Sequence, residues 1–80
     1  MTLKLTDSVY DLVRDIKDNW NNYADLSRLF FGDVSINSWR EIISTSDKID
    51  FIQYVIKYGD TGIVNEVTYE DIARVPFDDN

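Results

Sequence analysis

The sequence predicts a single, mostly α domain, a compact bundle of about four short helices. Two observations support this prediction. Apolar residues recur at helical spacing in four segments, and the three glycines and the one proline fall between or after those segments. The chain has 80 residues, enough for one domain, and its 44% apolar content is too high for a disordered chain. We therefore treat residues 1–80 as one domain.

The first helix is predicted from Ser8 to Asn21, with Thr6 or Asp7 as its N-cap. Its apolar residues follow the spacing of a single helix face: Val9, Leu12, Val13, Ile16 and Trp20. Aspartates with the same spacing form an acidic stripe on the opposite side, interrupted by Arg14 and Lys17: Asp7, Asp11, Asp15 and Asp18. This pattern predicts a helix with one face in the core and an acidic face in solvent.

Two shorter helices are predicted next, Tyr23–Phe31 and Ile36–Ser44. Gly32 fits the position after the first of them, where a left-handed residue is preferred, and Ser35 is a suitable N-cap for the second. The expected inner faces are Leu26, Leu29 and Phe30 in the first, and Ile36, Trp39, Ile42 and Ile43 in the second. Two adjacent aromatic residues on one short helix cannot both point inward. We therefore expect either Phe30 or Phe31 to lie at an interface or under the C-terminal tail.

A fourth helix is predicted from Asp47 to Tyr58. Ser44 and Asp47 have the spacing of a capping box, and Gly59 marks the end. Its apolar stripe consists of Ile49, Ile52, Val55 and Ile56. The predicted core of the whole domain combines residues from all four helices: Val9, Leu12, Val13, Ile16, Leu26, Leu29, Trp39, Ile42, Ile52, Val55 and Ile56.

The C-terminal segment has weaker signals. Residues 63–67 alternate like a short strand and have a possible partner in residues 2–5 at the N-terminus, which allows a small two-stranded β element. Thr68 followed by Asp71 has capping spacing for a short helix from Tyr69 to Arg74, and Pro76 would stop it. The fold class is thus mostly α with an optional β element.

The residue types present exclude most catalytic chemistry. The chain has no Cys and no His, so it lacks the usual zinc ligands and the usual general base. It also has no Gly-x-Ser-x-Gly turn and no glycine-rich phosphate loop. The aspartate stripe is typical of a solvated helix face rather than a paired-carboxylate site. We expect no enzyme activity, no catalytic residues, no metal and no cofactor.

The pattern of apolar residues also predicts the compartment. No stretch approaches the roughly 18 apolar residues of a membrane span, and the first residues lack the apolar core of a signal peptide. The absence of Cys suits a reducing compartment. We expect a cytoplasmic protein with no membrane partner.

The net charge of −7 is unevenly distributed along the chain. Residues 1–59 hold nine acids and seven bases, whereas residues 60–80 hold six acids and one base. A protein that binds the phosphate backbone needs clustered Lys and Arg, so this balance argues against direct binding of nucleic acid. It favours either solubility alone or attraction to a basic surface.

One segment carries a motif. Residues 26–42 run from a short helix through Gly32 to a second expected helix, and this arrangement resembles a helix-turn-helix. The resemblance would place Ser35, Asn37, Ser38 and Arg40 in the major groove of DNA. The turn is longer than that motif usually has, and the segment is slightly acidic. A plain helical hairpin is therefore the preferred interpretation of residues 23–44.

These observations favour a small acidic protein-binding module, an inhibitor or adaptor that occupies a basic surface of a nuclease or other nucleic-acid-binding protein. Nuclease immunity proteins, anti-CRISPR proteins and phage-encoded DNA mimics share this size and charge, although no motif connects the chain to them. The alternative is a helix-turn-helix transcription regulator built on residues 23–44. The sequence leaves the oligomeric state open. The candidate partner-binding residues are Asp7, Asp11, Asp15, Asp18, Glu70, Asp71 and Phe31.

Overall fold

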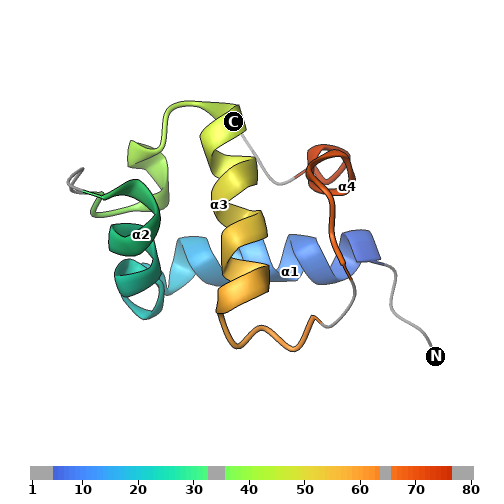
Figure 1. Cartoon of the computed structure of the whole chain (residues 1–80), viewed down its shortest axis with the longest axis horizontal. Helices are drawn as coiled ribbons and strands as arrows, with labels where there is room; N and C mark the ends of the chain where they lie inside the picture. Colours follow the sequence, from blue (N-terminus) through green and yellow to red (C-terminus); the bar gives the residue numbers. More distant parts are fainter. Residues whose placement is uncertain (1–4, 33–35, 64–65, 77–80) are drawn as a thin grey trace.

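The computed structural model describes residues 5–32, 36–63 and 66–76, and these residues form a small helical domain. The α-helices are α1 (Leu5–Asp18), α2 (Ala24–Phe31), α3 (Thr45–Tyr58) and α4 (Tyr69–Ala73). Two single 3-10 turns, η1 (Trp20–Asn22) and η2 (Trp39–Glu41), lie between them. Helix α3 packs against α2 on one side and α4 on the other, and α1 also contacts α4 (Figure 1). The prediction of a mostly α fold is confirmed.

Apolar residues from every helix except α2 are fully buried in one core. Eight predicted core residues are buried: Val9, Leu12, Val13, Ile16, Trp39, Ile42, Ile52 and Val55. Leu26 and Ile56 are half-buried against this cluster. The core also contains residues that the predicted list lacked, which are Trp20, Ile49, Phe51, Val67, Ile72 and Val75. Phe51 has no exposed surface and lies at the centre of the aromatic contacts.

The predicted inner face of α2 is wrong at Leu29, whose side chain is 72% exposed. The buried residue of this helix is instead Ser27, at 2% exposure. Two residues along a helix correspond to a rotation of about 200°, so a helix that turns Ser27 inward turns Leu29 toward solvent. The side chain of Ser27 is small, which suits a position where α2 meets the rest of the domain.

The structure contains the predicted capping residues at the end of α2 and at the starts of α3 and α4. The Ser44 hydroxyl accepts a hydrogen bond from the backbone N–H of Asp47 at 3.3 Å, so Ser44 is the N-cap of α3 and this half of the predicted capping box is confirmed. The helix begins at Thr45, two residues earlier than predicted. Thr68 and Asp71 form a complete capping box on α4. Gly32 has a φ of 70° directly after α2, as predicted for a glycine at that position.

The first helix begins earlier than predicted and also ends earlier. It starts at Leu5, so Thr6 and Asp7 belong to its first turn and neither is the N-cap. An aspartate in the first turn is favourable because the helix dipole is positive there. The helix ends at Asp18, and the following turn η1 buries Trp20, which therefore joins the core without belonging to α1.

The predicted helix from Ile36 to Ser44 does not form. Its described residues contain only the single turn η2, and Ser38 and Ile42, which flank that turn, both have extended backbones. Ser44 is also extended because it serves as the N-cap of α3, and a capping residue has non-helical dihedral angles. The second helix that a helix-turn-helix requires is thus missing over residues 36–44. Residue Ser35 of that motif lies outside the described residues.

No strand is found in residues 5–32, 36–63 and 66–76, so the two-stranded β element is not shown. Its expected strands fall partly on residues 1–4 and 64–65, which lie outside the described residues. None of the described helices is both long enough and apolar enough to cross a membrane.

Candidate protein-binding surface

The predicted acidic stripe forms on α1. Asp7, Asp11, Asp15 and Asp18 are all exposed, while the apolar face of the same helix is buried at Val9, Leu12, Val13 and Ile16. Successive members of the stripe are three or four residues apart, so they lie about one turn from each other along a rigid helix. Because the helix is anchored through its opposite face, these carboxylates keep their relative positions.

Asp15 differs from its neighbours because it is hydrogen-bonded within the chain. Its carboxylate accepts a bond from the side-chain amide of Asn19 at 2.7 Å and another from the hydroxyl of Tyr23. Burial raises the pKa of Tyr23 to about 12, and the hydrogen bond to Asp15 and its negative charge contribute further. The phenol therefore remains a donor at neutral pH and fixes the Asp15 carboxylate at the junction of α1 and η1.

A hollow of about 420 Å³ lies beside the middle of the stripe. Asp11 and Asp15 of α1 line it, and Asp60, from the loop after α3, lines it as well. The remaining lining residues are Ser8, Leu12, Tyr23, Thr61, Gly62 and Ile63. Among the described residues that line it there is no Lys or Arg, so acidic groups from two separate segments face one concavity.

The loop that carries Asp60 turns toward α1 through two local features. Gly62 has a φ of 77°, which L side chains rarely adopt, and the Thr61 hydroxyl accepts a hydrogen bond from the backbone N–H of Ile63 at 3.2 Å. The sequence indicated Asp60 as one of several acids after residue 59. Its approach to Asp11 and Asp15 depends on the path of this loop, which no motif predicted.

The three carboxylates of the hollow do not form a metal site. Among residues 5–32, 36–63 and 66–76, no group of three or more His, Cys, Asp or Glu residues is arranged to hold a metal ion.

The other candidate acids lie on α4, and neither lines the hollow. Glu70 is exposed. The carboxylate of Asp71 accepts a hydrogen bond from the backbone N–H of Thr68 at 3.1 Å, and the Thr68 hydroxyl accepts one from the N–H of Asp71 at 3.2 Å. The backbone N–H of Thr68, and its side chain to a smaller extent, stabilise the carboxylate and lower the pKa of Asp71. Asp71 thus has a structural role as part of the cap of α4.

Phe31 is part of an aromatic cluster. Its ring meets Phe30 edge-to-face at 4.8 Å between centroids and lies 5.5 Å from Phe51. Phe30 also contacts Phe51, and both adjacent residues are half-buried. The premise that two adjacent residues of this helix cannot both turn inward is wrong, because both rings pack on Phe51. The expectation that one of them lies at an interface or under the C-terminal tail stays a prediction. Among the residues that the structure describes, the exposed large apolar side chains are Leu29, Ile43, Tyr58 and Tyr69.

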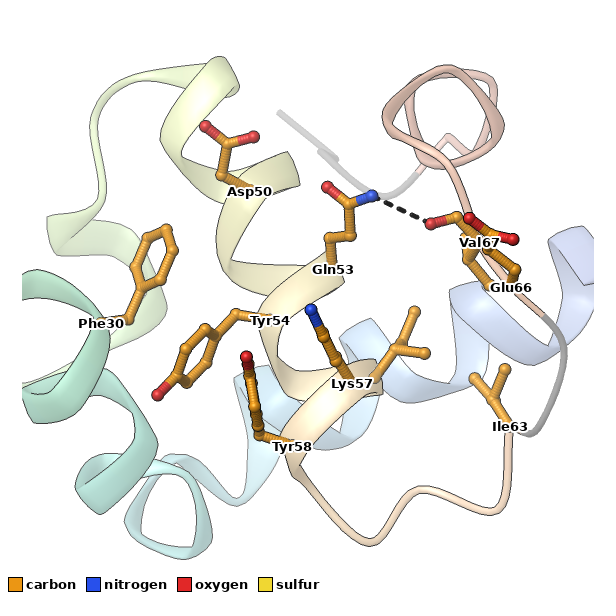
Figure 2. A pocket seen from close by; sticks show the side chains of 10 residues that line it. Phe30, Asp50, Gln53, Tyr54, Lys57, Tyr58, Ile63, Glu66 and Val67 are labelled. Carbon is orange, nitrogen blue, oxygen red and sulfur yellow. Dashed lines mark hydrogen bonds between the residues drawn. The ribbon is translucent and has the colours of Figure 1, made fainter.

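A second and larger concavity of about 910 Å³ runs along the outer face of α3 (Figure 2). Residues from about two turns of α3 form its floor: Asp50, Gln53, Tyr54, Ile56, Lys57 and Tyr58. Phe30 of α2 forms one wall, and Ile63, Glu66 and Val67 form the other. The side-chain amide of Gln53 donates to the backbone carbonyl of Val67 at 3.0 Å and holds that second wall against α3 (Figure 2). Ile63 lines both concavities.

Comparisons with models of protein families, with curated proteins and with solved structures found no match to this chain.

Proposed function

We propose that this chain is a small binding protein whose acidic surface docks on a basic surface of a partner protein, such as the nucleic-acid-binding groove of a nuclease. The observation that carries the proposal is the hollow lined by Asp11, Asp15 and Asp60, with no basic residue among its described lining residues. A Lys or Arg side chain of the partner would enter this hollow, and the rest of the α1 stripe would face neighbouring basic groups.

Two physical arguments support this mode of binding. The carboxylates are held by a helix and a packed loop, so little conformational entropy is lost when a partner binds them. Asp15 is also oriented in advance by Tyr23 and Asn19. The attraction acts between surface charges, so added salt should weaken binding by screening over about 8–10 Å.

The structure provides no support for the helix-turn-helix alternative, because η2 is a single turn in the segment where a recognition helix is needed. Arg28, one of the two basic residues of this segment, forms an ion pair with Asp25. We expect no appreciable binding to duplex DNA at about 0.15 M salt.

The test uses the full chain immobilised in an extract of the cells that produce it, with duplex DNA as the eluting competitor. A partner of the proposed kind is released by DNA and by salt. The variant Asp11→Lys with Asp60→Lys should lose it, since reversal of two charges in the hollow replaces attraction with repulsion. Asp15 is left unchanged in this variant because its reversal would also remove the bonds to Tyr23 and Asn19.

The matched control is Asp47→Lys with Glu66→Lys, which changes the net charge by the same amount at exposed positions outside both the hollow and the α1 stripe. We expect this control to weaken capture only slightly. Equal losses in both variants would mean that only total charge matters. Retention of the partner by the hollow variant, or tight binding of the chain itself to duplex DNA, would contradict the proposal.

A further inference from the structure

The groove along α3 carries opposite charges on one line of the helix. Asp50 and Lys57 both line it and are seven residues apart, which is two turns, or about 10 Å along the axis. Gln53 and Tyr54 lie between them at the middle of the groove (Figure 2). If a second copy of α3 lies antiparallel to the first, the acid of each helix therefore faces the base of the other.

We infer that this groove is a self-association surface, in which two copies of the chain pack α3 against α3 in antiparallel orientation. A two-fold axis between residues 53 and 54 would place Asp50 of one copy opposite Lys57 of the other, and the reverse pair would form by symmetry. Tyr54 and Gln53 of the two copies meet at the axis. The occupant of the groove is thus a second copy of this chain, selected by charge complementarity.

The aromatic residues of the groove supply apolar surface for the contact. The Tyr54 ring lies between the rings of Phe30 and Tyr58, at 5.2 Å and 4.6 Å between centroids and tilted by 54° and 45°. Tyr58 is 60% exposed, which is high for so large a side chain. The Lys57 ammonium lies 5.3 Å from the centre of the Tyr58 ring, and both side chains line the groove. Tyrosines of this kind are common at the centre of protein interfaces.

The overall charge of −7 on each copy opposes association. Such long-range repulsion is screened within about 8 Å at physiological salt, whereas directly apposed charges are screened less. The two Asp50–Lys57 pairs therefore determine the orientation, and the aromatic contact supplies most of the buried apolar area. The inference does not depend on the proposed function, because its test needs only the protein itself.

The test is sedimentation equilibrium of the full chain between about 10 μM and 1 mM at about 0.15 M salt, since dimerisation depends on protomer concentration. We expect a monomer–dimer equilibrium for the unaltered protein. Asp50→Lys places two lysines opposite each other across the axis, and Lys57→Asp places two aspartates there. Each variant alone should dimerise roughly tenfold more weakly, a change that corresponds to about 1.4 kcal/mol.

Mixing the two variants gives the decisive result. Asp50→Lys faces Lys57→Asp with two attractive pairs, so the mixture should form a heterodimer at least as readily as the unaltered chain dimerises. Native mass spectrometry distinguishes the heterodimer from the homodimers by mass. The controls Asp18→Lys and Arg14→Asp make the same charge changes on α1 and should leave dimerisation within about twofold of the unaltered chain.

Circular dichroism of each variant checks that the helices remain folded. A protein that is monomeric throughout the concentration range would overturn the inference. So would a dimer that both single variants leave unchanged, or a mixture that fails to restore association. None of these measurements depends on whether the acidic hollow binds a basic partner.

Discussion

Two neighbouring segments have similar apolar patterns but different structures. Residues 36–44 and residues 47–58 were both predicted to be helical from apolar residues at helical spacing. The second became α3, whereas the described residues of the first form only the turn η2. The two segments meet at Ser44, which caps α3 and for that reason cannot also be helical. A cap signal therefore marks the end of the preceding segment as well as the start of the next one.

The burial of Ile42 and Ile43 shows how the first segment meets the core without a helix. Ile42 is 3% exposed and Ile43 is 91% exposed. Adjacent residues of an extended chain point to opposite sides, whereas adjacent helical residues differ by only about 100°. Apolar spacing alone does not distinguish these cases in a short segment, because Trp39 and Ile42 reach the core in either conformation.

Among the predicted substitutions in these two segments, Phe51→Ala in α3 is expected to lower the free energy of unfolding the most. Phe51 is fully buried and contacts the rings of Trp20, Phe30 and Phe31, so its removal leaves a cavity between three elements. We expect the free energy of unfolding to fall by about 3–5 kcal/mol. Urea denaturation followed by circular dichroism measures this change. A loss below about 1 kcal/mol would show that Phe51 is not the packing centre of α3.

The next effect tests the extended conformation of residues 42–43. Ile42→Ala removes a buried side chain and should lower the free energy of unfolding by about 2–5 kcal/mol. Ile43→Ala, its matched control, removes an exposed one and should change it by less than about 0.5 kcal/mol. The same denaturation experiment compares the two. Similar losses at both positions would indicate that the segment turns both residues toward the core and is not extended there.

The outcomes for individual residues show how much of this fold the sequence predicts. Predicted caps were reliable at Ser44 and Thr68, where the side chain accepts a hydrogen bond from the backbone N–H three residues later. Such a bond depends only on a few adjacent residues. The apolar face of α1 was also correct. Leu29 was misplaced because α2 turns Ser27 inward, and the packing of α2 against α3 decides that rotation. The apolar pattern of α2 alone does not determine how this helix is rotated about its axis.

The candidate site divides in the same way. The α1 stripe follows directly from helical spacing, so its four aspartates were predicted and are exposed. The hollow requires Asp60 to come near Asp11 and Asp15 from 45 or more residues along the chain, and only the tertiary path of the loop brings it there. Asp71 was interpreted as a binding residue because of its charge, although its spacing from Thr68 also predicted a cap, and the structure shows both bonds of that capping box.

Ser44→Ala sharpens the comparison between the two segments at their boundary. The substitution removes the hydroxyl that accepts from the N–H of Asp47, and it should lower the free energy of unfolding by about 1 kcal/mol. If residues 36–44 formed a helix through Ser44, alanine would be a better helix former there and the protein would become slightly more stable. The sign of the change in thermal midpoint therefore separates the two conformations.

The smallest effect is expected at α4, where the cap differs from that of α3 by including a charged group. The hydrogen bonds from Thr68 hold the pKa of Asp71 below its usual value, so the folded pKa is lower than the unfolded pKa of about 3.9. The resulting stabilisation is fully present above the unfolded pKa and is lost as the pH falls through the folded pKa.

The variant Asp71→Asn tests this pH dependence. It keeps an acceptor for the N–H of Thr68 and removes the charge. The difference in thermal midpoint between the unaltered chain and this variant should be visible at pH 7 and disappear near pH 2. The matched comparison is Ser44→Ala, whose hydroxyl cap has no titrating group, so its difference from the unaltered chain should persist at both pH values. A gap for Asp71→Asn that stays constant with pH would show that the charge contributes nothing to the α4 cap.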